Sequence, residues 1–139
     1  MDEQTIKHLE IIQSVVERLA RNSFIYKGWS ITTVAAIIAL AAPGCSKHFM
    51  LIALLPSFTF WGLDAFYLKQ ERLYRRLYDD ARSKGTLNLR SGAFSMDIAP
   101  YETDEQTWLR ICWSKTIAFL YLPLVLIVIA AVVISYLLD

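Results

Sequence analysis

Apolar residues are concentrated in three long runs along the chain, and polar segments separate these runs. The runs are residues 22–42, 49–68 and 116–138. Each is about as long as the roughly 20 residues that an α-helix needs to cross the apolar core of a bilayer. The first run has Lys27 as its one charged residue, the second has Asp64, and the third has none. This pattern predicts three transmembrane helices.

Two of the predicted helices continue beyond their apolar runs with one apolar face. Such a face, recurring every three or four residues, is typical of a helix that packs against a partner. We therefore expect the two extensions to pack together as a short helical stalk. The alternative is that residues 3–22 form a helix lying flat on the lipid surface. The apolar positions are Leu9, Ile12, Val16 and Leu19 in the first extension and Phe66, Leu73 and Leu77 in the second.

Residues 85–106 are the one stretch without a helical pattern. Alternating side chains in TLNLR and AFSMDI flank the pair SG, which indicates a small β-hairpin. Thr103 followed by Gln106 has the spacing of a capping box. The third helix is therefore predicted to begin at Thr103 and to continue to the end of the chain. Pro56 and Pro123 lie inside the second and third runs, where proline usually produces a kink.

The predicted fold is an all-α membrane protein. Its three transmembrane helices extend into a cytoplasmic helical stalk, with a small non-helical insertion, the hairpin, before the third helix. This prediction divides the chain into four parts. They are a cytoplasmic amphipathic helix (1–21), a transmembrane hairpin (22–68), a cytoplasmic extension and loop that serves as a sensor (69–106), and the third transmembrane helix (107–139).

The basic residues predict the orientation. With the N-terminus inside, the loop 43–48 is outside and contains Lys47 alone of the 14 Lys and Arg residues. The other basic residues then face the cytoplasm or lie at its boundary, as the positive-inside rule requires. The N-terminus is therefore predicted to be cytoplasmic, and the C-terminus lies on the opposite side of the membrane.

Composition agrees with this picture and narrows the chemistry. The chain is 55% hydrophobic and 19% charged, whereas soluble domains are about half apolar and about a quarter charged. A net charge of +1 indicates that any basic binding site must be local. Cys45 and Cys112 are expected on opposite sides of the membrane, as are His8 and His48. We therefore predict no disulfide within the chain and no metal site.

No arrangement of residues indicates catalysis. The sequence has no glycine-rich phosphate loop and no nucleophile elbow. We expect that the protein is not an enzyme and needs no cofactor. A small three-span lipid kinase is the best enzymatic alternative, but it would need several clustered carboxylates at the membrane interface, where only Asp64 is expected.

Lys27 and Asp64 lie at equal distances in sequence from the centre of the loop 43–48. In an antiparallel helical hairpin such residues lie at the same depth, so we expect an intramembrane ion pair near the cytoplasmic face. A charge in the bilayer centre costs about 2.5–3.5 kcal/mol on insertion scales, and a partner offsets part of this cost. Two interpretations remain open: a gate or ion-site residue, or an ion pair that fixes the hairpin.

A basic stripe follows the second apolar run. It consists of Lys69, Arg72, Arg75 and Arg76. Tyr74 and Tyr78 lie between these cations. Guanidinium groups bind phosphates with paired hydrogen bonds, and aromatic rings stack on bases, so the stripe is a candidate oligonucleotide site. The alternative is a juxtamembrane patch that contacts anionic lipid.

Small and polar residues mark the first apolar run and suggest a pore wall. The candidate lining residues are Ser30, Thr33, Ile37 and Ile38, the last two forming a hydrophobic constriction. Three helices cannot enclose a channel, so a pore requires a homo-oligomer. The alternative is that the small residues serve only close helix packing.

Three stretches of the sequence, NSFIYKGWSITTVAA, FWGLDAFYLKQERLYRRLYDD and FSMD, resemble a family of small bacterial membrane proteins. This family comprises the membrane effectors of Hailong-type anti-phage defence, which are encoded beside a nucleotidyltransferase. The resemblance implies a homo-oligomeric ion channel, expected to be a tetramer, in the bacterial inner membrane, with the C-terminus in the periplasm.

The resemblance also implies how the channel is controlled. A single-stranded DNA oligomer made by the partner nucleotidyltransferase would hold it closed, and loss of this oligomer during infection would open it and depolarise the cell. The assignment of the oligomer to the basic stripe comes from charge and spacing. The remaining alternative is a non-conducting membrane scaffold that anchors a cytoplasmic partner.

Overall fold

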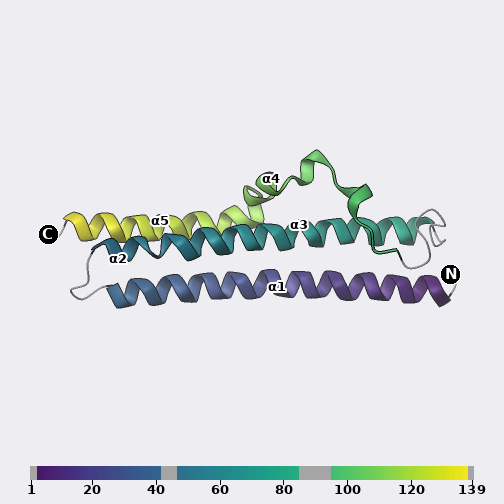
Figure 1. Ribbon diagram of the computed structural model, residues 1–139, viewed down its shortest axis with the longest axis horizontal. Coiled ribbons are helices and arrows are strands. Elements are labelled where there is room, and N and C mark those ends of the chain that lie inside the picture. Colours follow the sequence, from purple (N-terminus) through teal and green to yellow (C-terminus); the bar gives the residue numbers. More distant parts are fainter. Residues whose placement is uncertain (1–2, 42–46, 85–94, 138–139) are drawn as a thin grey trace.

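The structure, a computed structural model, describes residues 3–41, 47–84 and 95–137, and most of these residues are helical (Figure 1). No strand occurs among these residues. In chain order the elements are α1 (Glu3–Ala41), α2 (Lys47–Leu51), α3 (Leu54–Lys84), the 3₁₀ turns η1 (Ala99–Tyr101) and η2 (Asp104–Gln106), α4 (Trp108–Cys112) and α5 (Lys115–Leu137).

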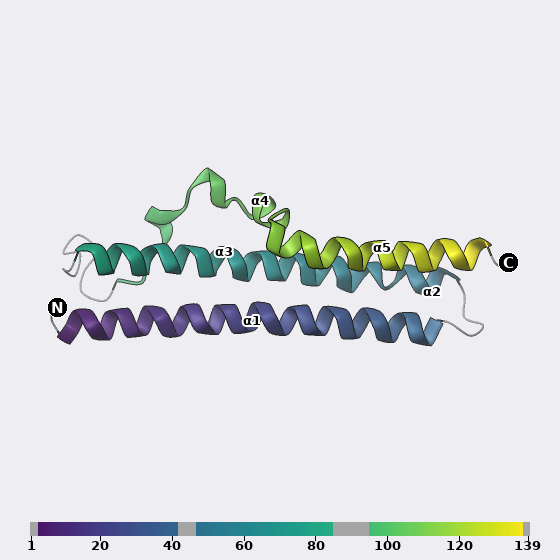
Figure 2. The same cartoon turned by 180° about the vertical axis from the view of Figure 1, so that it is seen from behind.

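The three expected long helical segments are present. Glu3–Ala41, His48–Ser83 and Lys115–Leu137 are each long and apolar enough to cross a membrane. α1 and α3 lie antiparallel and side by side, and α5 lies beside α2 and the first half of α3 (Figures 1 and 2). The N-terminal end of α1 and the C-terminal end of α5 therefore lie at opposite ends of the molecule.

The first helix is continuous from its amphipathic part into its apolar part. α1 has 39 residues and passes through Gly28 without a break. A Cβ atom at Gly28 would meet nothing within 4 Å, so packing does not require glycine there. The buried face recurs every three or four residues along the helix, as the periodicity predicts. Its members include Leu9, Ile12, Val16, Ser23, Ser30, Val34 and Ala41.

The two extensions pack together, and the predicted stalk is confirmed. Ile12 and Val16 of α1 form a buried cluster with Leu77 of α3. Residues 3–22 therefore lie along α3 instead of standing alone. Phe66 is an exception, because its side chain is 47% exposed and does not belong to the apolar face assigned to it.

The second apolar run is not one helix, because α2 ends at Leu51 and α3 begins at Leu54. Pro56 explains the interruption: proline has no N–H to donate, and its ring clashes with the carbonyl group four residues earlier, that of Ile52. The Ile52 carbonyl instead accepts from the Leu55 N–H at 3.1 Å. Pro123, by contrast, lies inside α5, which continues through it.

The prediction of one unbroken third helix from Thr103 is wrong. Thr103 precedes the 3₁₀ turn η2 without a side-chain cap, and α4 and α5 follow with a break between Cys112 and Lys115. In a continuous helix the Cys112 carbonyl would accept from the N–H four residues later. Here it accepts from the Trp61 Nε1 of α3 at 2.9 Å, so a contact between helices replaces one within the helix.

The predicted β-hairpin falls mostly on residues 85–94, outside the described residues. Its last part, Ser95–Ile98, has neither helix nor strand. Met96 and Ile98 pack against the stalk cluster, together with Tyr101. The segment before α4 thus lies against α3 and rises away from it toward α4 (Figure 1).

Candidate functional site

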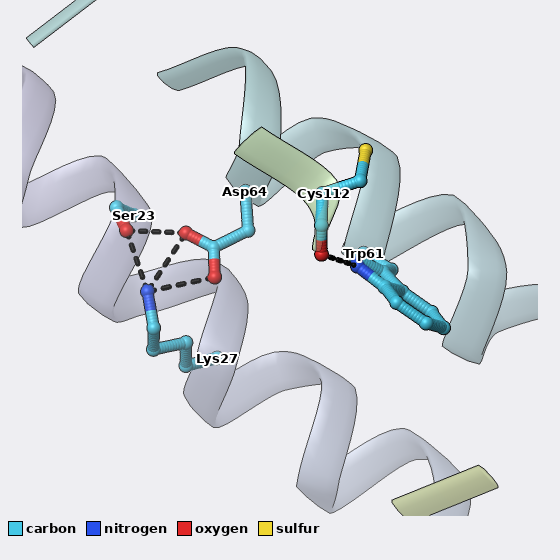
Figure 3. Close-up of polar contacts among 5 residues, drawn as sticks. All are labelled: Ser23, Lys27, Trp61, Asp64 and Cys112. Carbon is cyan, nitrogen blue, oxygen red and sulfur yellow. Dashed lines mark hydrogen bonds and ion pairs between the residues drawn. The ribbon is translucent and has the colours of Figure 1, made fainter. Parts of the chain in front are cut away.

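A fully buried carboxylate lies between α1 and α3. Asp64 of α3 is 0% exposed. The Nζ of Lys27 is 2.8 Å from Oδ1 of Asp64 and 2.7 Å from Oδ2 (Figure 3). The Ser23 hydroxyl also donates to Oδ1, and Lys27 donates to the Ser23 oxygen at 2.7 Å. Because Ser23 and Lys27 are four residues apart on one helix, α1 presents both to the same carboxylate.

The third long helix reaches the same point through aromatic residues. Tyr121 of α5 is fully buried and stacks on Trp61 of α3, with ring centroids 5.9 Å apart and planes 6° from parallel. The Tyr121 hydroxyl lies near Asp64, and no hydrogen bond joins it to another described residue. Trp61 in turn donates to the Cys112 carbonyl (Figure 3). All three long segments therefore meet around Asp64.

The electrostatics of this cluster are those of a closed ion pair. A buried charge is tolerated only with a partner and further hydrogen bonds, and Lys27 and Ser23 supply both. The Lys27 side chain is 24% exposed, so the cluster extends from the interior to the surface of the chain. Within the described residues, no group of three or more His, Cys, Asp or Glu side chains could hold a metal ion. The cluster therefore joins α1 to α3 through a buried ion pair.

Three of the four cations of the basic stripe are paired within the chain. Lys69 forms an ion pair with Glu102, and Arg75 pairs with Glu71 at 2.8 Å. Arg72 is partly exposed, and no ion pair or hydrogen bond joins it to another described residue. Fewer cations of the stripe are therefore available to bind a ligand than the sequence alone indicates.

Arg76 is the most strongly held of the four. Its Nη1 donates to Thr103 Oγ1 at 3.2 Å and to the Tyr101 carbonyl at 3.4 Å. With the Gln106 amide oriented so that its oxygen faces the guanidinium, Nε and Nη2 also donate to this oxygen at 3.2 Å. Gln106 is 6% exposed. Arg76 therefore holds residues 101–106 of its own chain against α3.

The stripe tyrosines also contribute to packing. Tyr74 and Tyr78 are half-buried against the stalk cluster of Ile12, Val16 and Leu77. Tyr78 and Arg75 nevertheless line a shallow groove, together with Gln13, Val16 and Asp79. The structure thus brings one tyrosine and one arginine of the predicted site to a common surface, beside α1.

The candidate pore residues occupy different sides of α1. Ser30 is fully buried within the chain, and its hydroxyl has no hydrogen-bond partner among the described residues. Ile37 and Ile38 are partly buried against the cluster of Val34, Ala53 and Val128, and Thr33 is half-buried. The small residues that remain exposed on this part of α1 are Thr32, Ala35, Ala36 and Ala39.

Sequence reasoning missed three residues that the structure adds to these sites. Ser23 has a recognisable signal, because it lies one helical turn before Lys27. Tyr121 has none, since its position against Asp64 depends on how α5 packs. Glu102 belongs to a segment without a periodic pattern, so its contact with Lys69 depends on tertiary structure.

The chain matches no protein-family model, and comparisons with curated proteins and with solved structures give no match.

Proposed function

We propose that the protein is a homo-oligomeric ion channel of the bacterial inner membrane, a tetramer by resemblance, that acts as an anti-phage defence effector. An oligonucleotide bound to the stalk, a DNA oligomer from a partner nucleotidyltransferase, holds the channel closed, and its loss depolarises the cell. The observation that carries this proposal is the buried cluster of Ser23, Lys27 and Asp64 between two helices long and apolar enough to cross a membrane. Ionisable residues inside membrane helices usually mark functional sites.

Exposed apolar surface supports an assembly in a membrane. Large apolar side chains that would face lipid or a neighbouring subunit occur on all three long segments, among them Phe24, Leu40, Leu55, Phe119 and Leu137, which are 68–85% exposed. A soluble monomer rarely exposes so much contiguous apolar surface. Three helices do not enclose a pore, so conduction requires several chains around a common axis.

The orientation follows from the basic residues. With the stalk in the cytoplasm, Lys47 is the one basic residue of the short outer loop, and the other Lys and Arg residues lie on the cytoplasmic side or at its boundary. The N-terminus is then cytoplasmic and the C-terminus periplasmic. The basic stripe faces the compartment in which a nucleotidyltransferase works.

Helix continuity supports a route from ligand to gate. α3 runs from Leu54 to Lys84 without a break, so the stripe and Asp64 belong to one rigid element. α1 spans the same distance on the other side of the ion pair. Movement of the stalk helices would therefore change the contact between Lys27 and Asp64. No other described residue pairs with Arg72. In an oligomer, Arg72 and the groove lined by Arg75 and Tyr78 would repeat around the axis and offer several phosphate contacts.

The competing function is a non-conducting scaffold, and ion flux separates the two. Purified protein is reconstituted into sealed vesicles loaded with an ion-sensitive dye, in the absence of DNA. The channel proposal predicts flux that grows with the amount of protein and is absent from protein-free vesicles. Vesicles that contain folded, oligomeric protein but leak no faster than empty ones would favour the scaffold.

A further inference from the structure

A short segment of the chain contacts two cations of the basic stripe, Lys69 and Arg76. We name residues 95–106 the strap. It contacts the stalk at several separate points: Ser95 accepts from the His8 ring at 3.0 Å, and Tyr101 donates to Asp80 Oδ2 at 2.8 Å. Arg76 binds the strap through the hydrogen bonds described above, and Lys69 pairs with Glu102.

These contacts differ in kind. Arg76 donates to neutral acceptors of the strap. Tyr101 packs beside the stalk cluster and donates to Asp80. These contacts hold the strap in place. Glu102 instead forms an ion pair with Lys69 at the surface of the stalk, where the Glu102 side chain is 54% exposed. Its carboxylate presents anionic oxygens to a lysine ammonium, as a phosphate group does.

We propose that the strap is an internal competitor for the ligand of the basic stripe. Glu102 occupies Lys69 in the absence of ligand, and an oligonucleotide phosphate displaces it. This inference rests on the proposed function, because it describes how the oligonucleotide site of that function is regulated. It also makes Arg76 a residue that positions the strap, and leaves Lys69, Arg72 and Arg75 for phosphates.

Displacement of the strap has a direct path to the ion pair. The strap continues into α4, where the Trp108 Nε1 donates to the Gly62 carbonyl of α3 at 3.1 Å. At the end of α4 the Cys112 carbonyl accepts from Trp61. Gly62 and Trp61 lie within one helical turn of Asp64. Movement of the strap would therefore be transmitted to the Asp64 cluster by the hydrogen bonds of Trp108 with Gly62 and of Trp61 with Cys112, and by the start of α5.

Two variants with the same charge change test the proposal. Glu102→Gln frees Lys69 and loosens the strap. Glu71→Gln frees Arg75 by breaking a pair within α3 and does not touch the strap. Both raise the net charge by one, so general electrostatic attraction changes equally. The probe is a fluorescently labelled short single-stranded DNA, titrated against the full-length protein in detergent at two salt concentrations. Backbone hydrogen exchange of residues 95–106 is followed with and without DNA.

The strap proposal predicts that Glu102→Gln binds DNA about two- to fivefold more tightly than the wild type, the range expected for removing one exposed ion pair. It predicts a smaller effect for Glu71→Gln. Saturating DNA should speed hydrogen exchange in the wild-type strap. If the two variants bind DNA with equal affinity and DNA leaves hydrogen exchange of the strap unchanged, the strap proposal is wrong and the proposed function still stands. If no variant and no wild-type protein binds DNA, the proposed function fails as well.

Discussion

Lys27 and Asp64 lie 37 residues apart in the sequence, and in the structure the Lys27 Nζ is 2.7 Å from Asp64 Oδ2. Their contact joins the two longest helices at the point where apolar segments give way to the stalk. Ser23 and Tyr121 lie beside the pair, and Tyr121 stacks on Trp61, so the third long helix packs at the same level. In the proposed mechanism, movement of the stalk and of the strap acts on the membrane-spanning segments through this ion pair.

Removal of both partners should destabilise the protein by less than the sum of the two single removals. Asp64→Ala leaves Lys27 without its counter-ion, and Lys27→Ala leaves a buried carboxylate unpaired, at a cost of about 3 kcal/mol or more. We expect the double variant to be more stable than the sum of the singles by about 0.5–3 kcal/mol. Unfolding in a denaturing detergent mixture measures all four proteins.

The exposed pair of Glu3 and Lys7 is the matched control for this cycle. Its side chains are 83% and 62% exposed, and the two residues are four apart on α1. The same four-protein cycle there should give a coupling of about 0–0.5 kcal/mol. Strict additivity at Lys27 and Asp64, or equal coupling in the two cycles, would show that the buried pair has no special role.

If α1 lines the pore, its hydrophobic constriction should respond to polar substitution. Ile37→Ser and Ile38→Ser should each raise the resting conductance, because a hydroxyl favours water in a narrow apolar passage. The control is Ile31→Ser, the same change at a 46% exposed position of the same helix. Unchanged currents in all three variants, with altered current in Ile127→Ser of α5, would assign the pore to the third helix.

The strap should be released at high pH. Burial and the hydrogen bond to Asp80 raise the pKa of Tyr101 from 10.0 to about 12. A group whose pKa is raised on folding stabilises the folded form below its unfolded pKa, and this contribution is lost as the pH rises through the folded pKa. Hydrogen exchange of residues 95–106, corrected for intrinsic rates, should therefore increase between pH 10 and pH 12.

Tyr101→Phe is the control for the pH prediction. It lacks the titrating hydroxyl, so its strap should exchange faster at neutral pH and show no further loss of protection attributable to this group. Strap protection that falls with the same pH profile in both proteins would assign the loss to other tyrosines or to general unfolding.

The membrane topology gives a prediction that does not depend on the ligand. A reporter enzyme that is active only in the periplasm, fused after Asp139, should be active, and a cytoplasmic reporter at the same position should be silent. The physical reason is the concentration of basic residues outside the short loop that contains Lys47. The reverse pattern would contradict the three-span arrangement.

Periodicity and spacing were enough to predict the long helices, the stalk and the contact of Lys27 with Asp64, because these depend on local pattern and on the symmetry of a hairpin. Two helix breaks were not predictable in the same way. The break after Leu51 has a local cause in Pro56, but its position depends on which hydrogen bonds replace the lost one. The break after Cys112 depends on Trp61, a residue 51 positions away.

The contacts of the basic stripe could be predicted only in part from the sequence. Charge and helical spacing find Lys69 and Arg76, but they do not reveal that both are paired with the strap. Glu102 and Lys69 are 33 residues apart, and a segment without a periodic pattern joins them. Such pairings depend on where an irregular segment docks, which sequence pattern alone does not determine.

Current recording from the purified protein in a planar bilayer, with a short single-stranded DNA oligomer added to one side and later digested by a nuclease, tests the central claim most directly. The account predicts an ion current without DNA, its suppression when DNA is added on the side of the stalk but not on the other side, and its return after digestion. No current under any condition, or a current that DNA leaves unchanged from both sides, would contradict it.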